Sequence, residues 1–293
     1  MKYKITFLIL TFQLQSFAQI DVLKNKIEAI TKGKKATVGV AILDLKTHET
    51  LTVNDGHYPM QSVFKFHLAL AVFNLIDKGK LLLNQKIHVK KEDWQPKTHS
   101  PLRDKYAAGN ADISLKEILS FTVSQSDNDG CDILFKLAGG TKKVNDFIHS
   151  TGVKDVSIVA TEAKMHKDWN VQYTNWSSPL AAAKLLESFY QKHILSKNSQ
   201  AELWKMLVET STGPTKIKGL LPKDAVVGHK TGWSGTNDAG LTGATNDIGI
   251  VTLPNGRQFA IAVFVMNSME KEATNDLTIA EISKAAYDYF LEK

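Results

Sequence analysis

The pattern of hydrophobic and polar positions near the start of the chain predicts one helix followed by two strands. Apolar residues recur at helical spacing over residues 20–31. Residues 38–43 (VGVAIL) form an unbroken apolar run typical of a buried strand, and residues 49–53 provide its return. We therefore expect a strand pair in this part of the chain.

The C-terminal part returns to strands after a long interval. Asn255-Gly256 is a strong hairpin signal between two runs rich in β-branched residues. An amphipathic pattern over residues 277–291 predicts a closing helix. The strands expected here are residues 226–230, 248–253 and 258–265.

The middle of the chain has helical patterns. Residues 63–76 are almost wholly apolar, which predicts a helix buried nearly all round. Ser114 and Glu117 have the spacing of a capping box that opens another helix. Further helices are expected over residues 128–137, ending at Gly139-Gly140, and from Pro179, with Ser177 or Ser178 as the cap.

This order of elements predicts an α/β protein of the α+β kind. An antiparallel sheet built from both parts of the chain, flanked by the terminal helices and carrying an all-helical insertion, satisfies it. We assign residues 19–58 and 209–293 to the sheet domain and residues 59–208 to the helical domain. The active site is expected between the two.

The first residues predict a secretory signal peptide. A basic start with Lys2 and Lys4 precedes the apolar residues 5–17 and the small residue Ala18. Because this apolar segment is too short to span the ~30 Å hydrocarbon core of a bilayer, we prefer a cleavable signal over residues 1–18 to a membrane anchor. Cleavage after Ala18 would leave a periplasmic chain with no membrane attachment.

The distribution of charge along the chain argues against nucleic acid as a partner. The formal net charge is +6, but basic and acidic residues are interspersed, so nucleic acid is not an expected partner.

The single cysteine, Cys131, stands in an apolar run and is expected to be a buried small hydrophobe. The nine histidines show no ligand spacing, so we expect no metal and no other cofactor. We expect a monomer.

Ser62 and Lys65 form the first candidate for chemistry. Ser62 opens the apolar helix and Lys65 follows one turn later on the same face. The helix N-terminus offers free N–H groups to an oxyanion, and an apolar environment would favour a neutral Lys65 that accepts the Ser62 proton. One such S-x-x-K pair is expected by chance, and a second over residues 268–271 is expected to be solvated surface.

Two tripeptides make the pattern specific. Ser126-Asp127-Asn128 stands at a boundary between two predicted helices, and Lys230-Thr231-Gly232 stands at the end of a predicted strand. Each alone could be an ordinary cap or strand end. All three motifs in this order resemble the signature of the serine β-lactamase and penicillin-binding protein superfamily.

The resemblance implies a fold and a set of roles. The fold would be the β-lactamase/transpeptidase-like fold, with a five-stranded sheet. Ser62 would be the acylated nucleophile, Lys65 its proton partner and Ser126 the donor to the β-lactam nitrogen. Asn128 would hold Lys65 and the substrate amide, and Lys230 and Thr231 would meet the substrate carboxylate. The backbone N–H groups of Ser62 and Trp233 would form the oxyanion hole.

Residues 161–175 decide between hydrolysis and transpeptidation. The segment is polar, without helical or strand periodicity, and resembles the omega loop of class A β-lactamases, which we place at about residues 161–178. Glu162 would then be the base that drives water onto the acyl-enzyme.

The loop is most similar to that of the extended-spectrum PER and VEB enzymes. His166 stands where Asn usually helps to hold the hydrolytic water, and Asn175 stands where an Arg–Asp clasp usually closes the loop. Gln61 before the nucleophile agrees with this subgroup. The resemblance implies a roomy site that accepts oxyimino-cephalosporins.

Several residues depart from the family pattern around the substrate. Trp233 replaces a small residue, beside Ser234, and its ring could stack on a substrate, crowd it or pack at the strand edge. Lys216 stands near an Arg of the subgroup that supports the substrate carboxylate, and Lys is the poorer bidentate partner. His99 occupies the aromatic gatekeeper position.

The favoured function is a class A β-lactamase that hydrolyses penicillins and cephalosporins and confers resistance. A D,D-peptidase is the first alternative, and a β-lactam-binding sensor that stays acylated is the second. The serine-dependent glutaminases, which lack this set of motifs, are a weaker one.

Overall fold

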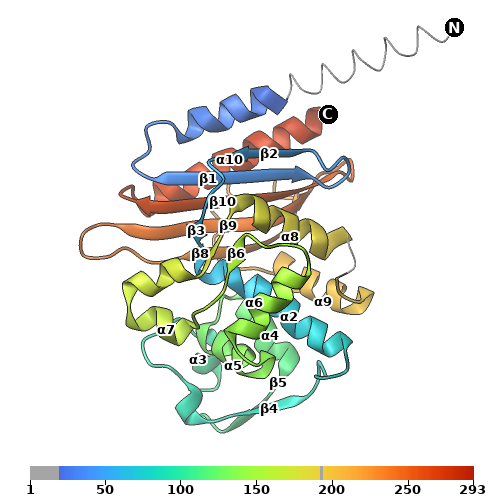
Figure 1. Ribbon diagram of the computed structural model, residues 1–293, viewed down its shortest axis with the longest axis vertical. Helices are drawn as coiled ribbons and strands as arrows, with labels where there is room; N and C mark the ends of the chain where they lie inside the picture. Colours follow the sequence, from blue (N-terminus) through green and yellow to red (C-terminus); the bar gives the residue numbers. More distant parts are fainter. Residues whose placement is uncertain (1–19, 192–193) are drawn as a thin grey trace, which may run out of the picture.

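A five-stranded antiparallel sheet forms one half of the molecule (Figure 1). The computed structural model describes residues 20–191 and 194–293, and the signal peptide predicted over residues 1–18 lies outside them. The strand order β2-β1-β10-β9-β8 confirms that both parts of the chain build one sheet. The strands are β1 (Thr37–Asp44), β2 (Thr50–Val53), β8 (Val226–Trp233), β9 (Thr242–Thr252) and β10 (Gln258–Ser268).

Helices cover both faces of this sheet, and the side chains of β1 show how. Val38, Val40 and Ile42 pack with the N-terminal helix (residues 20–31) and with α10 (Glu272–Glu292). Ala41 and Leu43 point the other way and join the core of the helical region. Because both faces are buried, the central strands β1 and β10 are apolar almost throughout rather than alternating. Figure 1 shows the two terminal helices above the sheet and the other helices below it.

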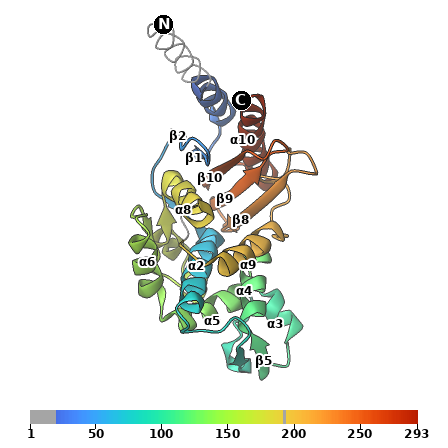
Figure 2. The same ribbon diagram turned by 90° about the vertical axis from the view of Figure 1, so that its right-hand side faces the viewer.

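The helical region is arranged around α2 (Phe64–Asp77), which Figure 2 shows passing through its middle. Ten consecutive residues from Phe64 to Phe73 are buried, as expected from their composition. His67 is among them, and burial lowers its pKa to about 4, so it stays neutral near pH 7. Around it lie α3 (Pro101–Lys105), α4 (Leu115–Ser124), α5 (Asn128–Ala138), α6 (Thr141–Ser150), α7 (Glu162–Lys167), α8 (Pro179–Gln191) and α9 (Lys197–Val208).

Short strands and 3-10 turns join these helices. One small sheet has the order β3-β7-β6 and another pairs β4 with β5. The strands are β3 (Tyr58–Pro59), β4 (Lys86–Val89), β5 (Ala111–Ser114), β6 (Val156–Ser157) and β7 (Trp176–Ser177), and the turns are η1 (Gln61–Val63), η2 (Lys91–Asp93) and η3 (Trp169–Thr174).

Some local predictions were incomplete. The segment 161–175, expected to be irregular, contains α7 and η3, each only six residues long and therefore too short to show periodicity. Helices α3, α6 and α9 were not predicted. Ser114 accepts a hydrogen bond from the Glu117 N–H, but the Glu117 carboxylate accepts from Lys105 and Tyr106 instead of closing the capping box. Ser178 caps α8 through the N–H of Ala181.

The second S-x-x-K sequence, residues 268–271, was predicted to be solvated surface, and this is wrong for its serine. Ser268 is fully buried at the end of β10, where its Oγ donates to Asn275 and accepts from the Glu270 N–H. It is therefore a structural residue that joins β10 to α10. In the part of the chain that the structure describes, no helix is long and apolar enough to cross a membrane.

Candidate active site

Two hollows meet at Ser62, between the edge strand β8 and the helical region. The larger, of about 440 Å³, extends from Ser62 along β8 to α10, and the smaller, of about 170 Å³, extends toward α7 and η3. Ser62, Asn128 and Trp233 line both hollows. A ligand that reaches Ser62 can therefore extend in two directions.

Contacts from the sheet fix the position of Ser62. Ser62 lies in η1, and Gln61 before it has φ +46°, a left-handed conformation that is strained for a residue with a side chain. The Asn246 amide on β9 donates to the Pro59 and Met60 carbonyls at 2.8 and 3.1 Å. A side chain at Gly232 would place its Cβ 2.4 Å from the Met60 oxygen. Glycine at this position is what lets β8 approach η1 so closely.

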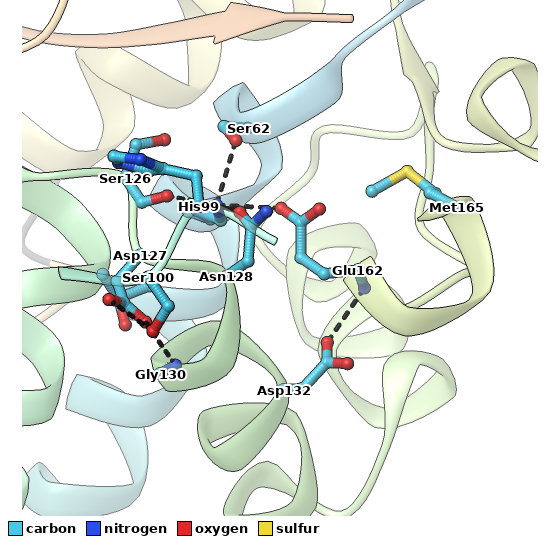
Figure 3. A network of polar contacts seen from close by, with 12 residues as sticks. Ser62, His99, Ser100, Ser126, Asp127, Asn128, Gly130, Asp132, Glu162 and Met165 are labelled. Atoms are coloured by element: carbon cyan, nitrogen blue, oxygen red, sulfur yellow. Dashed lines mark hydrogen bonds and ion pairs between the residues drawn. The ribbon is translucent and has the colours of Figure 1, made fainter. Parts of the chain in front are cut away.

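Lys65 is fully buried and contacts both groups expected beside it, Ser62 and Asn128, and also Glu162. Its Nζ lies 3.0 Å from Ser62 Oγ, 2.5 Å from Asn128 Oδ1 and 2.8 Å from Glu162 Oε1. It also donates to the Ser126 carbonyl at 2.7 Å. Figure 3 shows Ser62, Asn128 and Glu162 converging at this point. The surroundings are therefore more polar than the apolar run around Lys65 in the sequence indicated.

The Ser126-Asp127-Asn128 motif is held by its middle residue. Ser126 has φ +61°, a second left-handed residue at the site. The buried Asp127 carboxylate accepts from Ser100 Oγ and from the N–H groups of Leu102 and Gly130 at 2.7–3.0 Å (Figure 3). Asp127 thereby caps α5 and fixes Ser126 and Asn128 on either side of it.

Lys230 approaches the same motif from β8. Its buried Nζ donates to Ser126 Oγ at 2.9 Å and to the Thr231 carbonyl at 2.9 Å. Burial, helped by the positive charge of Lys65, lowers the pKa of Lys230 to about 7. Thr231 Oγ1 lies 2.6 Å from Thr212 Oγ1, and both threonines line the larger hollow.

Glu162 starts α7, and Asp132 on α5 holds that start in place. The two carboxylate oxygens of Asp132 accept from the N–H groups of Glu162 and Ala163 at 2.9 and 3.0 Å. Gln95 donates to the same carboxylate at 2.8 Å. This arrangement directs the Glu162 side chain toward Lys65 although α7 itself is short (Figure 3).

Asn175 and Gln172 tie the rest of this segment to the body of the protein. The buried Asn175 amide bonds the backbone N–H groups of Val159 and Ala160 and the Ala160 carbonyl at 2.8–2.9 Å. An uncharged side chain thus closes the loop. Gln172 accepts from Gln61 Nε2 at 2.7 Å, which connects η3 to the residue before the nucleophile.

The remaining predicted residues line the hollows. His99 is bonded to the Gln125 carbonyl at 2.9 Å and borders the larger hollow. Trp233, Ser234 and the exposed His166 border the smaller one. Lys216 borders the larger hollow, but its buried ammonium forms an ion pair with Asp276 that neutralises much of its charge.

Four residues of the site were missed by the sequence analysis as contributors: Asp127, Asp132, Gln172 and Asp276. Asp127 could have been found, since it is the middle residue of a recognised motif and stands at a helix N-cap. The other three act on residues 30 to more than 100 positions away in the chain. No local pattern announces such contacts.

A buried lysine within hydrogen-bond reach of a serine, with a carboxylate on its other side, is the arrangement of a serine acyl-transfer enzyme. Across residues 20–191 and 194–293, no group of three His, Cys, Asp or Glu side chains is placed to hold a metal ion. Cys131 is buried, and desolvation raises its thiol pKa well above the ordinary value, as suits a core residue.

Comparison with known proteins narrows this class. The model of the β-lactamase enzyme family matches residues 22–290. The chain is 48% identical to β-lactamase VEB-1 of Pseudomonas aeruginosa over 281 residues, which covers 95% of this chain and 93% of that protein. It is 47% identical to the extended-spectrum β-lactamase PER-1 of Pseudomonas aeruginosa over 290 residues, covering 98% and 94%.

Solved structures agree. The crystal structure of the TLA-3 extended-spectrum β-lactamase superimposes with a TM-score of 0.91 at 57% identity, covering 92% of this chain and 99% of that chain. The chain therefore belongs to the β-lactamase enzyme family and is a class A β-lactamase, with the transpeptidase-like fold expected from its motifs.

Proposed function

We propose that the enzyme hydrolyses penicillins and cephalosporins, including extended-spectrum cephalosporins, through an ester on Ser62. The observation that carries this proposal is the position of Lys65 Nζ, 3.0 Å from Ser62 Oγ and 2.8 Å from Glu162 Oε1. One lysine thus connects the nucleophile needed for acylation with the carboxylate needed for deacylation.

Acylation uses the groups on the Lys65 side first. Transfer of a proton from Lys65 to Glu162 leaves an amine that accepts the Ser62 proton as Oγ attacks the β-lactam carbonyl. The backbone N–H groups of Ser62 and Trp233 stabilise the oxyanion. Ser126, 2.9 Å from Lys230 Nζ, donates its proton to the ring nitrogen as the amide bond breaks. Lys65 then passes the proton from Ser62 on to Ser126 and takes back the proton it gave to Glu162, which is again a carboxylate before deacylation.

Deacylation needs a water molecule beside the ester. Glu162 borders the smaller hollow and is the base that takes a proton from this water as the water oxygen attacks the acyl carbon. The ester bond then breaks, and Glu162 returns the proton to Ser62 Oγ by way of Lys65. His166 borders the same hollow and supports the water where the family usually has Asn. A D,D-peptidase or a sensor needs no such base, so the position of Glu162 favours hydrolysis over both alternatives.

Substrate recognition divides between the two hollows. Lys230, Thr231 and Lys216 bind the substrate carboxylate on the side of the larger hollow, with His99 at its border. Asn128, Ser234 and Trp233 bind the acylamino side chain along the smaller one. The extended spectrum is carried over from relatives whose names state it.

The site of action is proposed to be the periplasm, after removal of residues 1–18. We infer that the mature enzyme works as a monomer on small β-lactams, without a membrane, nucleic-acid or metal partner.

Intact-protein mass measured against time after mixing with excess cephalosporin tests the proposal. A drug-sized adduct should appear and then vanish as the substrate is consumed. Glu162→Ala should slow deacylation by about 100-fold or more, so the adduct persists. Ser62→Ala should form no adduct, and Glu209→Ala, which removes an exposed carboxylate elsewhere, should behave like the unaltered enzyme.

Three outcomes would contradict the proposal. A persistent adduct on the unaltered enzyme would indicate a penicillin-binding protein or a sensor. Equal slowing of acylation and deacylation in Glu162→Ala would remove Glu162 as the deacylating base. An adduct on Ser62→Ala would refute the nucleophile.

A further inference from the structure

Trp233 carries its indole at the border of the active site, where about half of the residue is exposed to solvent. Its side chain stands at the end of β8 with 49% of the residue exposed to solvent. Among the described residues, it stacks on no other ring, and its indole N–H has no hydrogen-bond partner. About half of its surface is therefore open to solvent, and neither a ring contact nor a hydrogen bond among the described residues holds the indole in the fold.

Trp233 lies at the boundary between the two hollows of the site. It lines the larger hollow, where the substrate carboxylate is proposed to bind, and the smaller hollow beside Glu162. Its backbone N–H is in the oxyanion hole, so the ring is attached directly to the point where the β-lactam carbonyl must lie. A substituent of the β-lactam ring beside that carbonyl therefore lies close to the indole.

The smaller hollow has further groups suited to a flat ring. Trp169 from η3, His166 and Met165 from α7 line it together with Trp233. Aromatic faces and a thioether are favourable neighbours for an aromatic or heteroaromatic ring. The hollow measures about 170 Å³, which leaves room for a five- or six-membered ring on a short linker.

We propose that Trp233 is a specificity-determining residue that packs its indole against the flat ring of the β-lactam acylamino side chain. The preferred substrates are then β-lactams with an arylacetyl or heteroarylacetyl side chain. The indole N–H can donate to an oxygen of the same side chain. This inference rests on the proposed function, since it places the acylamino group on the Glu162 side of Ser62.

A matched pair of substrates isolates the effect of the ring. Two cephalosporins with the same 3-acetoxymethyl nucleus, one acylated with thienylacetyl and the other with cyanoacetyl, differ only in the group that would meet Trp233. Their kcat/KM values give a ratio that cancels any change in the nucleophile, in the oxyanion hole or in the fraction of folded enzyme.

Trp233→Ala should lower this ratio by about threefold to tenfold, the size of one aromatic contact, mainly through KM for the thienylacetyl compound. Trp233→Phe should retain most of the ratio because it keeps a ring. Val226→Ala is the matched control, since Val226 is 45% exposed at the other end of the same strand and should leave the ratio unchanged.

An unchanged ratio in Trp233→Ala would overturn the inference, and a raised ratio would show that the indole crowds the ring instead of binding it. Failure of the proposed function would look different. In that case the unaltered enzyme would hydrolyse neither cephalosporin, whatever residue stands at position 233.

Discussion

Lys65 and Lys230 show how surroundings make two identical side chains act differently. Both are fully buried and both contact Ser126. Lys65 has the Glu162 carboxylate at 2.8 Å, whereas Lys230 bonds only a hydroxyl and a carbonyl. The pKa of Lys230 falls to about 7 because of burial and repulsion from Lys65, against weaker attraction from Asp247 and Glu162. Lys230 therefore changes charge near neutrality.

This gives substrate binding a pH dependence with a definite sign. Lys230 carries its charge below pH 7 and loses it above, and a substrate carboxylate needs the charged form. KM for a β-lactam carboxylate should therefore rise about fivefold between pH 7 and pH 8. The methyl ester of the same compound, which has no charge to anchor, is the control. Parallel KM profiles for acid and ester would contradict the assignment.

At this scale the sequence predicted the residues that carry chemistry but not the ones that adjust them. Ser62, Lys65, Ser126, Asn128 and Lys230 belong to short motifs whose order is itself informative. The ion pair between Lys216 and Asp276 joins a loop to a distant helix. A sequence shows the lysine, but it does not show that a carboxylate neutralises it.

Among the elements, α7 depends most on its neighbours. A helix of six residues cannot hold itself together in water. Its first two N–H groups are bonded by the partly buried Asp132, whose carboxyl pKa is raised by desolvation. Asn175 and Gln172 fix the segment at two further points. The position of Glu162 therefore depends on side chains from outside α7.

Asp132→Ala should affect deacylation more than acylation. Without its anchor, the start of α7 loosens, and Glu162 moves from the point where it must meet water. Deacylation should slow about tenfold or more, as expected when a catalytic base is displaced by ~1 Å. The ratio of the two rates, from the mass time course, measures this. Asp146→Ala, which removes an exposed aspartate from α6, should not change the ratio. Equal loss of both rates would point to general destabilisation.

The predictability of elements followed their length and burial. The position of α2 could be predicted because ten consecutive buried residues leave a continuous apolar run. The segments α7 and η3 could not, because each has only six residues, at most two helical turns, and is held by polar contacts. Strand β9 is longer than predicted, since its first half, Thr242 to Asp247, is buried although it contains polar residues.

The whole molecule has two hydrophobic cores separated by the sheet. One lies under the helical region and includes Val63 and Phe64 beside the nucleophile. The other lies between the sheet and the terminal helices and includes Phe259 and Phe290, whose rings stack at 4.8 Å. The nucleophile and its proton partners lie on the first side, and the helix α10 from the second side reaches the site through Asp276, which pairs with Lys216.

Phe290→Ala tests this separation. Removing a buried aromatic ring should lower the free energy of unfolding by about 3–5 kcal/mol. In conditions where the variant remains folded, its kcat/KM should match that of the unaltered enzyme, because the lost contacts lie across the sheet from Ser62. Denaturant unfolding and initial rates measure the two quantities. A proportionate loss of kcat/KM in the folded variant would mean that the two cores are coupled.

The pairing of β1 with β10 determines when the enzyme can fold during its synthesis. Thr37 lies opposite Met266 in the central ladder, and the entire helical region separates them in the chain. During synthesis, β1 leaves the ribosome long before β10 is made. The Met60 segment that carries Ser62 is likewise made long before Asn246, which holds it in place. The growing chain can hold local helices and the β1–β2 hairpin, but neither the five-stranded sheet nor the active site. It becomes an enzyme only when β9 and β10 have been synthesised, because these strands complete the sheet beside β1 and hold the Met60 carbonyl through Asn246.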